Sequence, residues 1–201
     1  MKNYTIKKVS GQPDWDTVPT LSIDHRNTDD PTDVQAWAQI AYDDERLWVH
    51  LRAREVNLRT QESGPLARAW EDSCLEFFFC PIPGDSRYFN IELTPTGAMF
   101  LGVGSGCTGE RIRLLPADRQ TLFDIRPALC PDGWELFYSV PYSFIRRLFP
   151  DFAVTGGMEM RANCYKCGDC TVQPHYLAWN PPTSENPDFH RPQDFGALIF
   201  E

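Results

Sequence analysis

Apolar and polar residues alternate along two neighbouring stretches of the chain, 74–80 and 87–93. One parity in each stretch is apolar throughout: Leu75, Phe77 and Phe79 in the first, and Phe89, Ile91 and Leu93 in the second. Side chains in a strand point alternately to opposite faces of a sheet. The segment between the stretches, 81–86, is rich in the turn formers Pro, Gly and Asp. The pattern therefore predicts a β-hairpin with one apolar face against a core.

The opposite face of this hairpin carries a mixed set of side chains: Glu76, Phe78, Tyr88, Asn90 and Glu92. A carboxylate, amide, phenol and ring together are not typical of a merely solvated strand face, so we interpret it as a candidate binding surface. Trp70 precedes Glu76 by roughly 20 Å in a straight chain. The two side chains share a ligand only if the chain before Cys74 bends back over the sheet. The alternative is a loop tryptophan that plugs the edge of the core.

Further alternating or apolar stretches predict a second hairpin and a series of strands. The hairpin spans 36–42 and 46–53, and the strands are expected at 97–101, 110–115, 121–126, 133–140, 158–165 and 195–200. One short helix is expected at 141–149, where Pro141 suits a first helical turn. Strands at intervals of about ten residues predict an all-β fold, an antiparallel β-sandwich or jelly roll. We expect a single domain over 1–201, with an N-terminal arm over residues 1–15.

Composition and charge narrow the classes of partner. The chain has 201 residues and a formal net charge of −9, which argues against nucleic acid and anionic membranes as partners. No apolar run is long enough to span a bilayer. The N-terminal residues carry charge but no hydrophobic segment, so no signal peptide is expected and a cytoplasmic location is predicted.

The seven cysteines favour reduced thiols over a disulfide framework, because the count is odd and no export signal is present. Cys164, Cys167 and Cys170, followed by His175, have spacing that resembles a metal site. They do not form the two separated pairs that are usual for structural zinc. We therefore favour partly buried thiols, with zinc or an iron–sulfur cluster as the alternative.

Acidic residues suggest two other chemistries. Glu76 and Glu92 lie on one face of paired strands, and two carboxylates at a suitable separation cleave glycosidic bonds. That role requires environments that divide acid from base, which the sequence does not indicate. Asp29, Asp30 and Asp33 are weak candidates for calcium ligands, with solvated turns as the favoured reading.

Several motifs in the same order resemble the family 9 carbohydrate-binding modules: Trp70 and Glu76 within WEDSCLEFFF, the strand RYFNIEL, and the ending HYLAWNPP…DFHRPQDFGALIF. The earlier hairpin, AWAQIAYDDERLWVHLRARE, is similar to the opening strands of that family. The resemblance extends from about residue 16 to the end of the chain. It implies a β-sandwich that binds sugars, notably the reducing ends of glucan and xylan chains, within carbohydrate catabolism.

The resemblance also implies a set of binding residues. The family clamps a sugar between two tryptophans, which match Trp70 and Trp179, and hydrogen-bonds it through a carboxylate that matches Glu76. Arg87 and Asn90 are the nearest candidates for its arginine and amides, and Tyr88 lies on the same strand. No cofactor is required, although structural calcium is implied. The expected partner is a small saccharide, and no oligomeric state is indicated.

The sequence is also compatible with three other functions. The first is a glycoside hydrolase that uses Glu76 and Glu92. The second is a related sandwich that carries haem or a redox group. The third is an interaction module whose aromatic residues all belong to the core. The saccharide hypothesis requires the rings of Trp70 and Trp179 to meet over Glu76.

Overall fold

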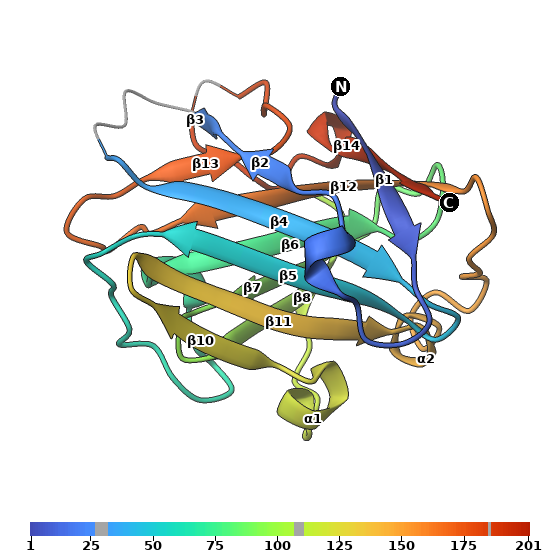
Figure 1. Cartoon of the computed structure of the whole chain (residues 1–201), viewed down its shortest axis with the longest axis horizontal. Helices are drawn as coiled ribbons and strands as arrows, with labels where there is room; N and C mark the ends of the chain where they lie inside the picture. The colour runs from blue at the N-terminus through green and yellow to red at the C-terminus, as the bar shows by residue number, and fades with distance from the viewer. Residues whose placement is uncertain (27–31, 107–110, 185) are drawn as a thin grey trace.

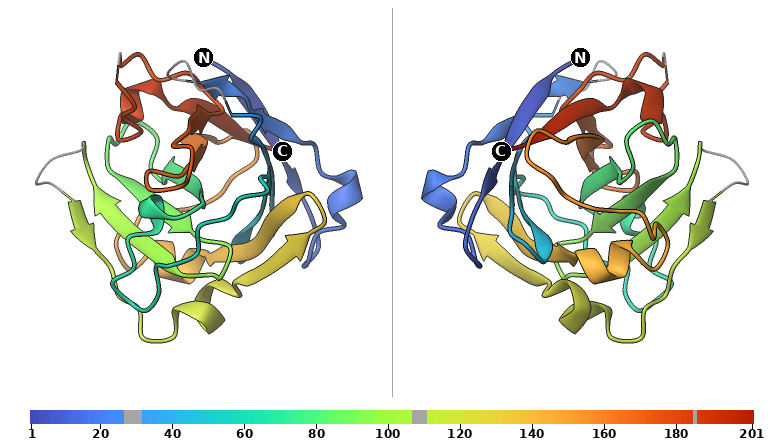
Figure 2. Two further views of the ribbon diagram at one scale, coloured as in Figure 1. Left: turned by 90° about the vertical axis from the view of Figure 1, so that its left-hand side faces the viewer. Right: turned by 90° about the vertical axis from the view of Figure 1, so that its right-hand side faces the viewer.

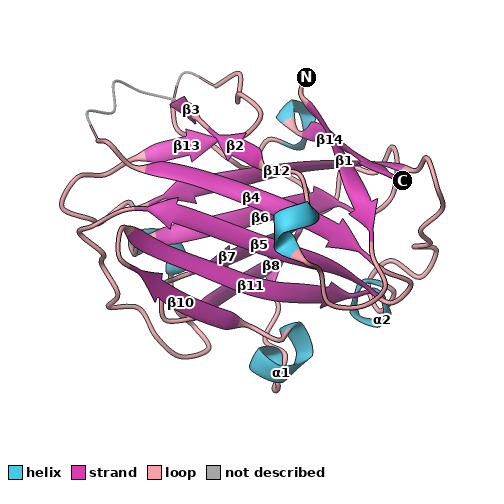
Figure 3. Cartoon of the chain, viewed as in Figure 1, coloured by secondary structure: helices cyan, strands magenta, loops and turns pink. Residues whose placement is uncertain are grey.

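The computed structural model describes residues 1–26, 32–106, 111–184 and 186–201. Strands dominate this part of the chain (Figures 1 and 3). In sequence order they are β1 (Asn3–Lys8), β2 (Leu21–Ile23), β3 (His25–Arg26), β4 (Gln35–Tyr42), β5 (Arg46–Arg54), β6 (Cys74–Cys80), β7 (Tyr88–Leu93), β8 (Met99–Gly104), β9 (Arg111–Arg113), β10 (Arg126–Cys130), β11 (Gly133–Pro141), β12 (Glu159–Cys167), β13 (Tyr176–Ala178) and β14 (Gly196–Phe200).

Helical segments are short. They are the α-helices α1 (Arg119–Phe123) and α2 (Tyr142–Ile145) and the 3₁₀ turns η1 (Trp15–Thr17), η2 (Ala69–Glu71) and η3 (Pro192–Asp194). None of the helices in the described ranges has the length and apolar character needed to cross a membrane.

The strands form two layers that face each other, as the end-on views of Figure 2 show. One layer has the order β10-β11-β5-β4, and the other has the order β14-β12-β6-β7-β8-β9. Strand β1 joins them: Asn3–Ile6 pair with β14, and Lys7–Lys8 pair with β4. Both pairings of β1 are parallel. The pairs β4–β5, β6–β7 and β6–β12 are antiparallel. The predicted β-sandwich is confirmed.

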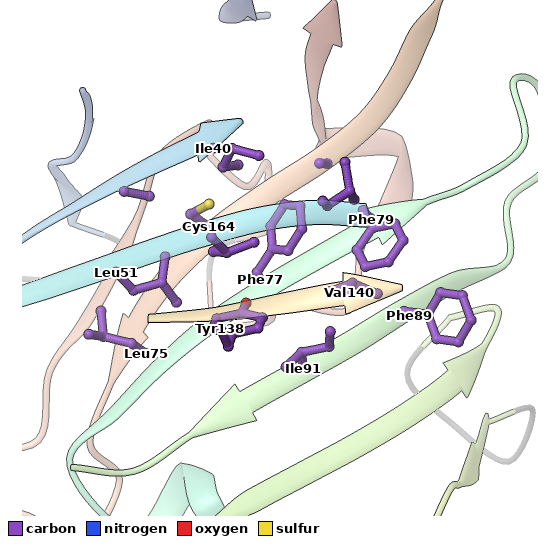
Figure 4. Packing of buried hydrophobic residues seen from close by; sticks show 14 of the residues in the cluster. Ile40, Leu51, Leu75, Phe77, Phe79, Phe89, Ile91, Tyr138, Val140 and Cys164 are labelled. Atoms are coloured by element: carbon purple, nitrogen blue, oxygen red, sulfur yellow. The ribbon is translucent and has the colours of Figure 1, made fainter. Parts of the chain in front are cut away.

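The core fills the space between the two layers. Figure 4 shows Phe77, Phe79, Phe89 and Ile91 of β6 and β7 opposite Leu51, Tyr138 and Val140 of β5 and β11. These residues belong to the apolar parity of each strand, and all are buried. The predicted hairpin partners are also in register, with Phe77 opposite Ile91 and Phe79 opposite Phe89.

Three predicted segments differ from the structure. Residues 121–126 were expected as a strand, but α1 occupies the first half of this stretch, up to Phe123, and β10 begins only at Arg126. A short apolar run does not distinguish a helix from a strand, and here Phe123 turns into the core against Phe144 at a centroid distance of 5.0 Å. The helix expected at 141–149 is shorter: α2 ends at Ile145, and turns follow in which the amides of Arg147 and Leu148 donate to the carbonyls of Phe144 and Ile145, each over 3.1 Å. The arm expected over residues 1–15 contains β1.

The outer face of β6 and β7 is also buried, although the sequence predicted an open surface. A second cluster covers it, comprising Cys74, Phe78, Cys80, Tyr88, Tyr165, Phe189 and Phe195 among others. The segment before β14 supplies the cover: Phe189 stacks on Tyr165 at 4.0 Å, and His190 stacks on Phe78 at 5.2 Å between centroids. The face remains accessible at the end where Glu76 and Glu92 lie.

Candidate functional site

A pocket of about 260 Å³ opens at this end of the β6–β7 face. Its walls come from segments that are distant in sequence: η2, β6 to β9, the end of β12, β13 and the segment 187–190. The lining residues are Trp70, Glu76, Glu92, Phe100, Arg111, Cys167, Asp169, Tyr176, Pro187, Asp188, Phe189 and His190. Aromatic rings and charged groups therefore converge on one concave space, which is the usual composition of a small-ligand site.

Two carboxyl groups form the floor of the pocket. Glu76 of β6 and Glu92 of β7 are directly opposite in the strand register, and their exposed fractions are only 2% and 4%. Asn90 Nδ2 donates a hydrogen bond to Glu92 Oε1 over 2.8 Å, and Cys167 Sγ donates to Glu76 Oε1 over 2.8 Å. Glu92 Oε2 is buried without a hydrogen-bond partner among the described residues.

Burial raises the pKa of both floor carboxyls. The pKa of Glu76 lies well above its ordinary value, first because of desolvation and second because of the neighbouring charge of Glu92. Desolvation likewise raises the pKa of Glu92 to about 7, against the opposing effect of the Asn90 hydrogen bond. Near neutral pH the pair therefore holds a proton, so the floor offers both a donor and acceptors to a bound hydroxyl group.

Trp70 lies against this floor because the chain before β6 bends back over the sheet. This bend is the condition under which Trp70 and Glu76 were predicted to share a ligand. The η2 turn is closed by the Asp72 amide donating to the carbonyl of Ala69 over 3.1 Å. The carbonyl of Trp70 accepts from the Asp169 amide over 3.0 Å, which fixes the turn to the segment after β12. The half-buried indole meets Phe100 edge-on, with ring centroids 5.3 Å apart.

Trp179 does not line the pocket, and its predicted place in the site is wrong. Its side chain is 3% exposed and belongs to the core between the layers. Strands β13 and β14 pair with successive parts of β12, and the indole packs over Gly196, where an added Cβ would approach it to 2.7 Å.

Residue parity explains why Tyr176 lines the pocket and Trp179 does not. Leu177 and Trp179 share the parity that faces the core. Tyr176 has the opposite parity, lines the pocket and packs edge-on near Phe189 at 6.3 Å. The alternation of Tyr176, Leu177, Ala178 and Trp179 was the sequence signal that could have identified Tyr176.

Arg87, which was predicted to bind the ligand, does not line the pocket either. It lies in the turn before β7, pairs with Asp85 through Nε–Oδ2 at 2.9 Å and covers the ring of Phe149. The arginine of the pocket is Arg111 of β9, which sequence reasoning missed because β9 reaches the site only through the β8–β9 pairing.

Tyr88 and Asn90 do not line the pocket, but each forms a hydrogen bond to a residue that does. The Tyr88 hydroxyl is bonded to the carbonyl of Gly106 at 3.1 Å and to His190 Nδ1 at 2.9 Å. Asn90 is fully buried and orients Glu92 through the hydrogen bond already described. Burial, followed by the charge of Arg111, lowers the pKa of His190 to about 3, so this pocket residue is neutral at neutral pH.

The alternative interpretation, a metal site at Cys164, Cys167, Cys170 and His175, is not supported, because these side chains do not converge. Cys164 faces the core between the layers, Cys167 faces the pocket and Cys170 is exposed. His175 Nε2 instead lies 2.7 Å from Lys166 Nζ. The described cysteines are free, which fits the favoured reading of reduced thiols.

Of the three candidate calcium ligands, only Asp33 lies among the described residues. Asp29 and Asp30 lie outside the described residues, whereas Asp33 is exposed and lines a small pocket of about 50 Å³ with Glu55. The Glu55 carboxylate already pairs with Lys166 Nζ at 3.1 Å. Its charge is therefore neutralised within the protein, and these two residues do not fit a calcium ion. The calcium prediction rests on Asp29 and Asp30.

Comparisons with known proteins agree with this architecture. The model of a family described as carbohydrate-binding family 9 matches residues 14–200. A solved Bacteroides uniformis protein, provisionally assigned to carbohydrate binding, has 29% sequence identity and a TM-score of 0.85, with 100% of this chain and 99% of that chain covered. A search of curated proteins finds no match.

Two more distant structures share the fold. A family 9 carbohydrate-binding module of Caldicellulosiruptor kristjanssonii in complex with glucose has 14% identity and a TM-score of 0.69, covering 100% of this chain and 96% of that chain. The same organism's module in complex with cellotriose has 14% identity and a TM-score of 0.68, covering 100% and 94%.

Proposed function

The chain belongs to carbohydrate-binding family 9, and from that premise we propose that the pocket above Glu76 and Glu92 binds a saccharide without cleaving it. The observation that carries the proposal is that Trp70 lines the same pocket as the two buried carboxyl groups. The ligand that we propose is the terminal unit of a glucan- or xylan-type chain.

The aromatic walls suit the apolar faces of a sugar. A pyranose ring presents C–H groups on its two faces and hydroxyl groups around its rim. Flat, rigid aromatic side chains match such faces and lose little conformational entropy on binding. We assign Trp70 to one face of the sugar, and Tyr176 takes the role that the family resemblance gave to Trp179.

The floor suits the hydroxyl rim. Glu76 and Glu92 supply a proton and acceptor oxygens, and Arg111 supplies a cationic donor from the side. Hydrogen bonds to charged groups contribute about 1.5–3 kcal/mol each when well placed. One or two such bonds would give the pocket most of its selectivity for a polyhydroxylated ligand.

Size favours the end of a chain over an internal segment. The volume of about 260 Å³ lies just below the range of about 300–1,000 Å³ that is usual for small-ligand pockets. A pocket of this size supports one sugar unit with the remainder of the chain in solvent. The pocket size therefore supports recognition of a terminal unit, and the family resemblance adds the expectation that this unit is the reducing end.

Hydrolysis by the same carboxyl pair is the alternative, and the electrostatics favour it less. Glycosidases need one protonated and one ionised carboxyl group in different environments. Glu76 and Glu92 share one buried environment that raises both pKa values. Turnover of aryl glycosides that is lost in both Glu76→Gln and Glu92→Gln would establish the hydrolase instead.

Titration calorimetry with gluco- and xylo-oligosaccharides tests the proposal. The wild-type protein should bind at least one series, and Trp70→Ala should weaken binding about tenfold or more, because it removes an aromatic contact. Arg87→Ala is the control, since Arg87 is exposed outside the pocket. Borohydride reduction of the sugar end should abolish binding if the reducing end is recognised. No binding by the folded wild type, or equal binding by Trp70→Ala, would overturn the saccharide assignment.

A further inference from the structure

Two thiols and a carboxyl group meet beneath the pocket floor. The ligand atoms of Cys74, Glu76 and Cys167 all lie within 4.8 Å of one another, and the three residues are buried. Within this group, Cys167 Sγ and Glu76 Oε1 are 2.8 Å apart. Such a set contains the donor types that borderline-soft divalent cations prefer.

The backbone holds these three residues in a fixed arrangement. Cys74 and Cys167 are directly opposite in the antiparallel pairing of β6 and β12. Glu76 lies two positions along β6 from Cys74, so both side chains point to the same face of the sheet. Because β6 is an inner strand paired with β12 and β7, a cation would not need to order a flexible loop.

A fourth negative group and an access path complete the arrangement. Glu92 is opposite Glu76 on β7, and its Oε2 atom is buried without a hydrogen-bond partner in the part of the chain that the structure describes. Glu76, Glu92 and Cys167 all line the pocket. A cation could therefore reach the cluster from solvent, and the unsatisfied carboxylate oxygen is available to it.

We propose that Cys74, Cys167 and Glu76 form a binding site for a zinc-type divalent cation, with Glu92 or a water molecule in the fourth position. Tetrahedral zinc with Zn–S bonds of about 2.3 Å sets its sulfur ligands about 3.8 Å apart. Donor atoms within 4.8 Å of one another reach that geometry by side-chain adjustment. Binding forms two Zn–thiolate bonds and one Zn–carboxylate bond and releases the thiol protons, together with the carboxyl proton where it is present, to solvent.

The chemistry distinguishes this site from the calcium that the family resemblance implies. Thiolates are poor ligands for calcium and magnesium, which take oxygen donors. The proposal does not rest on saccharide binding, because the three ligands form the cluster without a sugar in the pocket. Glu76 and Glu92 also line the saccharide pocket, so a bound cation would change the groups that they offer to a sugar.

Cobalt substitution of the full-length, reduced and metal-stripped protein tests the site. Titration with Co²⁺ should produce a thiolate-to-cobalt charge-transfer band and strong tetrahedral d–d absorption that saturate at one Co²⁺ per chain, and Zn²⁺ should displace both. Cys74→Ser and Cys167→Ser should each remove the charge-transfer intensity. Glu76→Gln should weaken Co²⁺ binding at least about 10–100-fold, the cost of losing even an outer-shell partner.

Two cysteines serve as matched controls. Cys80→Ser changes another buried thiol on the same strand, and Cys170→Ser changes an exposed thiol near β12; both variants should keep the bands. A folded, reduced wild type without a charge-transfer band would overturn the proposal. Bands that survive in both Cys74→Ser and Cys167→Ser would do the same.

A second measurement avoids reliance on variants that could misfold. In the zinc-loaded wild-type protein, X-ray absorption at the zinc edge should show about two sulfur neighbours at about 2.3 Å. A zinc ion with only nitrogen and oxygen neighbours would reject the site.

Discussion

Two buried acidic regions lie on either side of β12 and differ in how their charges are satisfied. Glu55 is bound by Lys166 Nζ at 3.1 Å, Trp134 Nε1 at 3.0 Å and Ser73 Oγ at 2.8 Å. Glu76 and Glu92 face each other instead, and Glu92 Oε2 has no hydrogen-bond partner among the described residues. Consecutive residues of β12 serve the two regions, since Lys166 pairs with Glu55 and Cys167 contacts Glu76.

The pKa values follow this difference. Burial alone would raise the pKa of Glu55, but the charge of Lys166 and the hydrogen bonds hold it below its ordinary value. Burial raises the pKa of Glu76 and Glu92, where no comparable partner compensates. A buried carboxylate with all its partners stabilises a fold, whereas one that lacks them can gain those partners from a ligand. We therefore expect the first region to govern stability and the second to govern binding.

The largest expected effect is on stability, from Lys166→Met. This change leaves the Glu55 charge buried without its cation, which costs about 3–5 kcal/mol of unfolding free energy. Urea denaturation measures the loss. The double variant Lys166→Met/Glu55→Gln removes the orphaned charge and should recover much of the stability. A single variant as stable as the wild type would show that the Glu55 region is not the stabilising one.

The pH dependence of stability should have opposite signs in the two regions. The folded-state pKa of Glu92 is raised from 4.5 to about 7, so the folded state binds more protons than the unfolded state between those values. The unfolding free energy of metal-free protein should therefore fall as pH rises from about 4.5 to about 7, by about 1.4 kcal/mol for each unit of pKa difference. The contribution of Glu55, whose pKa is lowered, is instead lost as pH falls.

Glu92→Gln isolates the pocket contribution to this profile. Denaturation curves at several pH values with a chelator present should show a flatter decline for Glu92→Gln than for the wild type. Identical profiles would mean that Glu92 titrates alike in the folded and unfolded states, which would contradict the role assigned to its burial.

Glu76→Gln should weaken saccharide binding without lowering the unfolding free energy. Loss of the Glu76 carboxyl group should weaken saccharide binding by about 1–3 kcal/mol, the cost of leaving a buried hydrogen-bonding group without its partner, measured by calorimetry. The unfolding free energy should not decrease, because a neutral amide replaces a poorly compensated buried carboxyl group. Glu55→Gln is the matched control, and it should lower stability while the folded protein keeps its saccharide affinity. If Glu76→Gln lowered stability and Glu55→Gln weakened saccharide binding, the assignment of stability to the Glu55 region and binding to the pocket would be wrong.

Sequence reasoning identified the parts of this molecule that depend on alternation within a strand. The hairpin of β6 and β7, its core face and the position of Glu76 all follow from parity, and they agree with the structure. Strands β1, β2, β3, β10 and β13 were missed because they are short or lie in or next to Pro- and Asp-bearing segments, where no period is visible.

The site was less predictable because its walls come from segments that are distant in sequence. Whether Arg87 or Arg111 reaches the pocket depends on how β9 pairs with β8, which no local pattern reveals. The cover over the β6–β7 face likewise depends on the docking of the segment 187–195, so a face that looked open is buried.

Tyr176→Ala should give the smallest effect, and it tests the correction to the aromatic pair. Removing the half-buried ring should weaken saccharide binding by about 0.5–1.5 kcal/mol, the contribution of an aromatic contact beyond burial. Calorimetry should show no change in affinity for folded Trp179→Phe, because Trp179 packs in the core over Gly196. Since Trp179 and Tyr176 lie on opposite faces of one short segment, the pair of variants separates a core ring from a pocket ring. If affinity fell in Trp179→Phe but not in Tyr176→Ala, Trp179 and not Tyr176 would be the second ring that contacts the sugar.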